Sequence, residues 1–235
     1  MVRLYSIEGN IGSGKSTLIQ YLKEYFKNRT DVVFIDEPVH LWHTIKDNND
    51  KTILSHFYED SGKWGFSFQI MAYISRLAEI RKKIKTNPSA IFISERCLLT
   101  DRYVFAKMLY DDKKIHTIDY QIYLKWFDEF LEDISMAGYI YLRTSPQKCL
   151  ERVIKRNREG ETIPIEYLEK CHKYHMDYID LLEKQNNSVL ELNGNEEKSE
   201  EMLCYLAQNI ENYCSLNKTN DIYLSLFEKG HIVGC

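Results

Sequence analysis

Short apolar runs alternate with longer segments of helical spacing along this chain. The runs are short enough to be buried strands, and they cover residues 2–7, 32–36, 90–94, 139–143 and 188–192. The segments between and after them predict helices over residues 15–27, 64–85, 98–110, 118–136, 146–156, 164–185 and 197–213. Because a helix between two parallel strands serves as a crossover connection, this alternation predicts an α/β fold with a five-stranded parallel sheet flanked by helices.

The predicted helix over residues 64–85 has the clearest period. Its apolar side chains recur at helical spacing and predict a single stripe that faces the core: Ile70, Tyr73, Ile74, Leu77 and Ile84. Gln69 and Arg76 border this stripe. They are either an ordinary boundary pair, with Arg76 beside Glu79 on the surface, or a pair that hydrogen-bonds the planar edge of a ligand.

Nothing in the sequence divides the chain, which has no repeat, low-complexity linker or break in composition. Its 235 residues correspond to ~1.6 average domains, and we expect one domain over residues 1–214. Residues 215–235 follow the last predicted helix without a clear period, and the sequence assigns them no structure and no role.

Charge and cysteine content narrow the class of protein. The chain has 31 basic and 35 acidic residues and a net charge of −4, which argues against a nucleic-acid or membrane-surface partner. Its six cysteines form no C-x-x-C pair or zinc spacing, so we expect reduced thiols. With no expected signal peptide, transit peptide or long apolar span, the sequence favours a cytoplasmic protein and does not exclude a nuclear one.

A phosphate-binding motif lies between the first strand and the first helix. Residues 9–16 match G-x-x-x-x-G-K-[ST], and we expect nucleotide contacts from Gly9, Asn10, Ile11, Gly12, Ser13, Gly14, Lys15, Ser16 and Thr17. Lys15 would bridge the β- and γ-phosphates of a nucleoside triphosphate, and Ser16 would bind Mg²⁺. The alternative is a glycine-rich turn with a solvated lysine.

Two acids at strand ends limit the reaction. The D-x-x-G and N-K-x-D motifs of GTPases are absent, whereas Glu37 follows the second predicted strand and Glu95 follows the third, with Arg96 next to it. Parallel strands present their carboxyl ends at one edge, where ligands bind. One carboxylate near Mg²⁺ and one free to accept a proton would suit phosphoryl transfer to a hydroxyl. Otherwise Glu37 is a solvated loop acid and Glu95 a charge at a helix N-terminus.

A basic segment stands out in this acidic chain. Four of the seven residues from 152 to 158 are basic: Arg152, Lys155, Arg156 and Arg158. Such a cluster is either a solvated helix face or, because Gly160 and Pro164 interrupt the helix, a mobile arginine-rich lid over residues 152–163 that closes on phosphates.

Together the motifs resemble the deoxynucleoside kinase family, which includes deoxycytidine, deoxyguanosine, mitochondrial thymidine and insect multisubstrate kinases. The resemblance rests on residues 7–17, 37–39, 58–59, 64–69, 95–96, 101–105 and 152–168, in order and at similar spacing. It implies a P-loop kinase fold and an enzyme that moves the γ-phosphoryl group of ATP or another nucleoside triphosphate to the 5′-hydroxyl of a deoxynucleoside. It also implies Mg²⁺ and a homodimer that associates through residues 118–136.

The resemblance assigns roles on the reacting side of the site. It makes Glu37 the general base and Arg96 the residue that holds both Glu37 and the 5′-oxygen, while Glu95 joins Ser16 at the metal. Lys15, Arg156 and Arg158 would assist the transfer. Arg152 and Arg156 would add to the donor site.

On the nucleoside side, the resemblance pairs Tyr58 with Glu161 at the 3′-hydroxyl. Gln69 is similar to the amide that reads the base, and Phe68 and Phe105 are similar to the aromatic residues around it.

Base preference follows from Arg76 and Asp101. In the family, thymidine-accepting kinases have small or apolar residues at these two positions, whereas deoxycytidine and deoxyguanosine kinases have an arginine and an aspartate. We therefore expect deoxycytidine and/or purine deoxynucleosides rather than thymidine. A nucleoside monophosphate kinase of the same fold, with Arg76 at the acceptor phosphate, and a non-catalytic nucleotide-binding regulator are the alternatives.

Overall fold

The computed structural model describes residues 2–131, 134–157, 161 and 163–228, with only the backbone considered from 215 onward. The predicted sheet is confirmed. Its strands are β1 (Arg3–Glu8), β2 (Val32–Ile35), β3 (Ile91–Glu95), β4 (Gly138–Arg143) and β5 (Val189–Asn193). They pair in parallel in the order β2-β3-β1-β4-β5, so β1 is the central strand and lies between β3 and β4.

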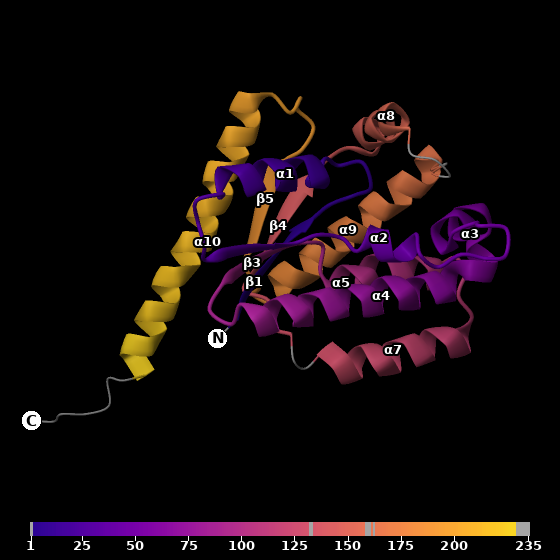
Figure 1. Ribbon diagram of the computed structural model, residues 1–235, viewed down its shortest axis with the longest axis horizontal. Helices are drawn as coiled ribbons and strands as arrows, with labels where there is room; N and C mark the ends of the chain where they lie inside the picture. Colours follow the sequence, from indigo (N-terminus) through magenta and orange to yellow (C-terminus); the bar gives the residue numbers. More distant parts are fainter. Residues whose placement is uncertain (1, 132–133, 158–160, 162, 229–235) are drawn as a thin grey trace, which may run out of the picture.

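Helices cover both faces of the sheet (Figure 1). One face packs on α1 (Lys15–Tyr25) and α10 (Glu200–Glu228), and the other on α4 (Ser61–Thr86), α7 (Thr117–Leu131) and α9 (Ile165–Lys184). Alternate residues of β1 supply the two cores, because Tyr5 belongs to the α1 side and Leu4 to the α4 side. Both are fully buried. The fold is therefore the α/β arrangement that the alternating pattern predicts.

Helix α4 begins earlier and turns a different face inward than the sequence predicts. The Asp60 carboxylate accepts hydrogen bonds from the backbone N–H groups of Gly62 and Lys63 and so starts the helix before residue 64. Ile74 does not join the predicted stripe and is 40% exposed, whereas Arg76 is buried. The inward face of α4 includes polar positions because the helix borders a cavity as well as the core.

The segment predicted as a single helix over residues 98–110 is helical but not uniform. It contains α5 (Leu98–Thr100), a π-helix, η1 (Asp101–Ala106), and α6 (Lys107–Asp111). A π-helical turn has one more residue than an α-helical turn, which changes the direction of the side chains that follow. Such turns often occur at functional sites, and η1 holds Asp101 and Phe105 at the cavity.

Two short helices before α4 have no counterpart in the prediction: α2 (Val39–Trp42) and α3 (Ile53–Glu59). Their apolar residues pack against α4 in a small core of their own. Thr52 starts α3 by accepting a hydrogen bond from the Ser55 backbone N–H. Helix α8 (Pro146–Arg156) matches the prediction. Four residues of the predicted lid, 158–160 and 162, lie outside the described residues.

The last helix is longer than predicted. We expected it to end at residue 213, but α10 continues to Glu228. Figure 1 shows its second half extending beyond the sheet. Away from the sheet, packing no longer imposes a helical period of apolar residues, which explains why residues 215–228 show no clear pattern. None of the helices described here is both long and apolar enough to cross a bilayer.

Candidate active site

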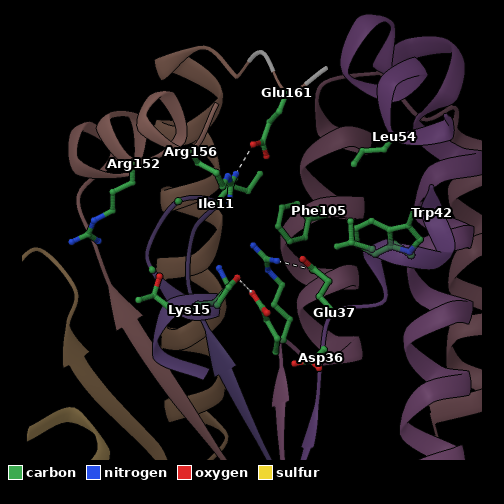
Figure 2. A pocket seen from close by; sticks show the side chains of 18 of the residues that line it. Ile11, Lys15, Asp36, Glu37, Trp42, Leu54, Phe105, Arg152, Arg156 and Glu161 are labelled. Carbon is green, nitrogen blue, oxygen red and sulfur yellow. Dashed lines mark hydrogen bonds and ion pairs between the residues drawn. The ribbon is translucent and has the colours of Figure 1, made fainter. Parts of the chain in front are cut away.

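A cavity of about 920 Å³ opens at the carboxyl ends of β1, β2 and β3, between α8 on one side and α2, α3 and α4 on the other (Figure 2). Many predicted site residues line it: Ile11, Gly12, Gly14, Lys15, Ser16, Thr17, Glu37, Tyr58, Phe68, Gln69, Arg76, Glu95, Arg96, Asp101, Phe105, Arg152, Arg156 and Glu161. Among the predicted residues that the structure describes, Gly9, Asn10 and Ser13 do not line it. Arg158 lies outside the described residues.

The phosphate loop is held in its turn by glycines and by Asn10. Gly12 has a φ of 78°, and a Cβ built on it would lie 2.4 Å from the carbonyl oxygen of Cys149, so no other residue fits there. The Asn10 side chain donates to the carbonyl oxygen of Leu168 at 2.8 Å and accepts from the Ile11 N–H at 2.8 Å. Asn10 therefore braces the loop from behind.

Lys15 begins helix α1 and is buried under this loop. Its ammonium donates to the carbonyl oxygens of Gly9 and Asn10 at 3.0 and 2.8 Å. Burial and the nearby Arg96 guanidinium lower the pKa of Lys15 to about 8, against the opposing effect of Glu95 and Glu37. Lys15 is thus close to losing its proton in mildly alkaline solution, and a bound anion would restore its affinity for that proton.

Ser16 and Glu95 form a pair beside Lys15. The Ser16 hydroxyl donates to Glu95 Oε1 at 2.8 Å, which brings the first turn of α1 to the end of β3. Within the described chain, no three acidic, histidine or cysteine side chains converge as a metal cage. A hydroxyl next to one carboxylate is instead the kind of site at which Mg²⁺ is held jointly by protein and phosphate oxygens. The residues present fit that ion.

Glu37 lies at the centre of a charged network at the end of β2. Its Oε1 accepts from Arg96 Nη1 at 2.7 Å and from Arg76 Nη2 at 3.0 Å. Burial raises the pKa of Glu37, but the charges of Arg96, Arg76 and Lys15 outweigh it and hold that pKa well below its ordinary value. Glu37 is therefore ionised at neutral pH, and the interpretation of it as a freely solvated loop acid does not hold.

Arg76 is fixed by several partners at once. Its Nε donates to Asp101 Oδ2 at 2.9 Å, and its Nη1 donates to the backbone carbonyl oxygen of Glu95 at 2.6 Å. Both Arg76 and Asp101 are about 2% exposed. The surface interpretation of Arg76 is therefore wrong, and the two positions from which we predict base preference form a buried ion pair.

Arg96 adopts an unusual backbone conformation to reach Glu37. Its φ is 62°, in the left-handed region that non-glycine residues rarely occupy. Two hydrogen bonds hold it there. The Arg96 N–H donates to the Ile7 carbonyl oxygen at 3.1 Å, and the Ser94 hydroxyl donates to the Arg96 carbonyl oxygen at 2.8 Å. Its guanidinium carbon lies 5.1 Å from the centre of the Phe105 ring. This strained backbone conformation therefore occurs at the residue whose guanidinium group lines the cavity.

An aromatic pocket adjoins this network. Phe68 packs face to face with Phe57, with ring centres 4.5 Å apart, and edge to face with Trp42 at 5.3 Å. Gln69 is 2% exposed, and its Oε1 has no hydrogen-bond partner among the described residues. A buried, unpaired amide oxygen is costly, and a ligand with a donor group would satisfy it.

Sequence reasoning missed the wall opposite Phe105, which α2 and α3 supply. Val39, Trp42, Leu54 and Phe57 line the cavity there, and Figure 2 shows Leu54 and Trp42 across from Phe105. The helical spacing of Leu54 and Phe57 after the capping Thr52 is the signal that could have found this wall.

Glu161 and Arg152 connect the segment over residues 152–163 to the rest of the site. The Tyr58 hydroxyl donates to Glu161 Oε1 at 3.5 Å, and Arg156 Nη2 donates to Glu161 Oε2 at 2.5 Å. Arg152 instead donates to backbone oxygens, from Nη1 to Ser13 and Gly194 at 2.9 and 2.8 Å. The predicted Tyr58–Glu161 pair therefore does come together, and Arg152 ties the phosphate loop to the loop after β5.

Comparison with known proteins agrees with this arrangement. A family model described as deoxynucleoside kinase matches residues 5–215. Deoxycytidine kinase of Bos taurus is 34% identical over 199 residues, which cover 76% of this chain and 75% of that protein. Deoxycytidine kinase 1 of Xenopus laevis is 36% identical over 199 residues, covering 76% and 74%. Mitochondrial thymidine kinase 2 of Homo sapiens is 36% identical over 176 residues, covering 74% of this chain but only 63% of that protein, less than two thirds of its length.

Proposed function

The chain belongs to the deoxynucleoside kinase family, and on that premise we propose that it transfers the γ-phosphoryl group of ATP to the 5′-hydroxyl of deoxycytidine and/or a purine deoxynucleoside. The observation that carries this proposal is the Glu37–Arg96 pair beside Lys15 and the Ser16–Glu95 pair. Glu37 would then face the acceptor hydroxyl, and Glu95 would lie beside Ser16 at the metal-bound phosphates.

Glu37 orients the attacking 5′-hydroxyl and takes its proton. Both arginine contacts use Oε1, and within the described residues Oε2 accepts no hydrogen bond, so Oε2 is the atom that faces the hydroxyl. A carboxylate with so low a pKa is a weak base. In the loose transition state of phosphoryl transfer, however, positioning and charge stabilisation matter more than base strength.

The cationic groups neutralise the transferred group. Lys15 bridges the β- and γ-phosphates, and Arg156, which lines the cavity, contacts the γ-phosphate. Arg158 lies outside the described residues, and its part in the transfer stays a prediction from the sequence. Arg96 holds Glu37 and the 5′-oxygen together. Ser16 and Glu95 would hold Mg²⁺, which when bound would supply positive charge against the phosphate oxygens.

The nucleoside occupies the aromatic pocket. Tyr58 and Glu161 bind the 3′-hydroxyl, Gln69 binds the edge of the base, and Phe68 and Phe105 contact its ring. The unpaired Gln69 Oε1 supports this placement, because a buried acceptor is stabilised by a hydrogen-bond donor such as an exocyclic amino group or ring N–H of the base.

The preference against thymidine rests on the Arg76–Asp101 pair. The relatives include both deoxycytidine and thymidine kinases at similar identity, so the choice depends on individual residues. Arg76 is buried and held by Asp101 and the Glu95 carbonyl oxygen, and such a rigid guanidinium leaves little room for a thymine methyl group. Asp101 accepts from an amino group on cytosine or a purine.

The nucleoside monophosphate kinase alternative needs a free cation for the acceptor phosphate. Arg76 was the candidate, but its five N–H groups already make four hydrogen bonds, to Asp101, Glu37 and the Glu95 carbonyl oxygen. A monophosphate would have to displace these partners. The non-catalytic regulator is disfavoured because Lys15, Glu37, Glu95 and Arg96 are present with mutual contacts.

We also propose a homodimer formed through α4 and α7. Both helices carry large apolar side chains on the outer surface: Ile74, Ile118, Ile122 and Trp126 are 40%, 71%, 43% and 51% exposed. Burying them against a second copy removes this apolar surface from water.

Separate reactions with deoxynucleosides and with their monophosphates, each with Mg·ATP, test the proposed function. We expect 5′-monophosphates to form from the deoxynucleosides, identified by chromatography and ³¹P NMR. Phosphorylation of the monophosphates alone would establish the monophosphate kinase instead, and nucleotide binding without turnover would establish the regulator.

A further inference from the structure

A second lysine lies at the phosphate loop, in the loop between β5 and α10. Lys198 lines the same cavity as Lys15, together with its neighbours Glu197 and Ser199. Its Nζ is buried, yet it has no hydrogen-bond partner within the part of the chain that the structure describes. No salt bridge with a described carboxylate involves it either. An ammonium in this situation has lost water without gaining a partner, which is unfavourable unless a ligand supplies the missing acceptor.

The Lys198 side chain extends over the start of helix α1. A Cβ built on Gly14 would lie 3.0 Å from Lys198 Cε and 3.9 Å from its Nζ, so the end of the Lys198 side chain lies next to Gly14. The same Cβ would lie 3.6 Å from Arg152 Nη1. Lys198 and Arg152 therefore flank the residue that precedes Lys15, where the backbone N–H groups of a phosphate loop face an anion.

Arg152 fixes the loop that carries Lys198. It bonds the carbonyl oxygens of Gly194 and Glu196, both at 2.8 Å, and also that of Ser13 in the phosphate loop at 2.9 Å. The position of Lys198 relative to the phosphate loop is thus set by three hydrogen bonds to one guanidinium. Its cation is preorganised and needs no loop closure.

The charged groups that act on Lys198 differ from those that act on Lys15. Burial lowers the pKa of Lys198 to about 8, with a contribution from Arg152 that outweighs the opposing one from Glu196. Lys15, in contrast, feels the charges of Arg96, Glu95 and Glu37. The charges that act on Lys198 are thus those of Arg152 and Glu196, whereas those that act on Lys15 include both acids at the strand ends.

We propose that Lys198 is a donor-binding residue that contacts a non-transferred phosphate of the nucleotide, the α- or β-phosphate, across from Gly14. This inference rests on the proposed nucleotide site and deepens it. Lys15 and Lys198 then hold the polyphosphate from two sides, the first from beneath the loop and the second from the loop after β5. Lys198 binds ATP and ADP alike, because both contain the phosphates that it touches.

The test compares equilibrium binding of ADP and ATP, with Mg²⁺ and without acceptor, by titration calorimetry. In Lys198→Met, which keeps an unbranched side chain up to the Cε position and removes the ammonium group, we expect both nucleotides to bind about tenfold more weakly, equivalent to about 1.4 kcal/mol. The factor should be similar for ADP and ATP, and Lys198→Arg should recover most of it. Lys184→Met, the same change at an exposed lysine at the end of α9, is the matched control and should bind as the wild type does.

A second readout separates ligand binding from a structural role. Because Lys198 is unpaired, its replacement by methionine should leave the melting temperature without nucleotide unchanged or higher, while the increase caused by ADP becomes smaller. Unchanged ADP and ATP affinities in Lys198→Met would refute the inference, as would weakening confined to ATP, which would place Lys198 at the transferred phosphate. If the wild type itself bound neither nucleotide, the proposed function would fail, not the assignment of Lys198 alone.

Discussion

Replacing Glu37 by glutamine removes one negative charge from a site in which two guanidinium groups bond the same carboxylate oxygen. Arg96 Nη1 and Arg76 Nη2 lie 2.7 and 3.0 Å from Glu37 Oε1, and the Glu37 side chain is only 18% exposed. Glutamine keeps an acceptor at that position. It loses the charge that strengthens both hydrogen bonds and the oxygen that would accept the proton of the 5′-hydroxyl.

Two magnitudes follow from this geometry. Both hydrogen bonds keep a charged guanidinium donor in Glu37→Gln but lose the ion-pair attraction to the carboxylate, which at about 1 kcal/mol for each of the two contacts lowers the free energy of unfolding by about 2 kcal/mol. For a chain of this length that corresponds to a decrease in melting temperature of about 4–8 °C. Loss of a positioned proton acceptor costs about 10²- to 10⁴-fold in kcat, or about 2.7–5.4 kcal/mol of transition-state stabilisation.

Steady-state kinetics with saturating Mg·ATP and calorimetric titration of the deoxynucleoside separate these effects. Glu37→Gln should lower kcat by at least about a hundredfold and change nucleoside affinity by less than about threefold. Asp36→Asn is the matched control, since Asp36 lines the same cavity but pairs with Lys23 in solvent and is 61% exposed. Its kcat should remain near the wild-type value. A fully active Glu37→Gln enzyme would remove Glu37 from the proposed role.

Three further outcomes follow from the same structure. Arg76→Met combined with Asp101→Ala should raise kcat/KM for thymidine, and no gain in a thymidine assay would contradict the proposed base selectivity. As the pH rises through about 8, Lys15 loses its proton, so kcat/KM for ATP should fall in the pH profile while remaining full at lower pH; a flat alkaline limb would count against this protonation state. Trp126→Lys should convert the dimer to a 27.9 kDa monomer in sedimentation velocity, whereas a wild-type monomer would disprove the proposed association.

The strands, and the edge of the sheet at which the site lies, could be predicted because each depends on a short contiguous stretch of sequence. Buried parallel strands read as short apolar runs, and the ends of such runs place Glu37 and Glu95 at one edge of the sheet. The phosphate loop is likewise a contiguous motif. Contacts such as Ser16 to Glu95, which are 79 residues apart, follow once the strand order is known.

Other features depend on packing that the sequence does not encode locally. Ile74 satisfies the helical period but faces outward, because α4 turns polar residues such as Arg76 toward the cavity. The π-helix over Asp101–Ala106 arises within a segment of ordinary helical composition. Lys198 carries no motif at all, and only the folded chain brings it to Gly14.

A competition assay among the four deoxynucleosides tests both the proposed kinase activity and its base preference. The four deoxynucleosides are supplied together at equal concentration with Mg·ATP, and their 5′-monophosphates are quantified at early times. We expect deoxycytidine monophosphate and/or a purine deoxynucleoside monophosphate to accumulate first and thymidine monophosphate to lag well behind. Thymidine as the preferred substrate would contradict the selectivity assigned to Arg76 and Asp101, and no phosphorylated product from any of the four would contradict the proposed activity itself.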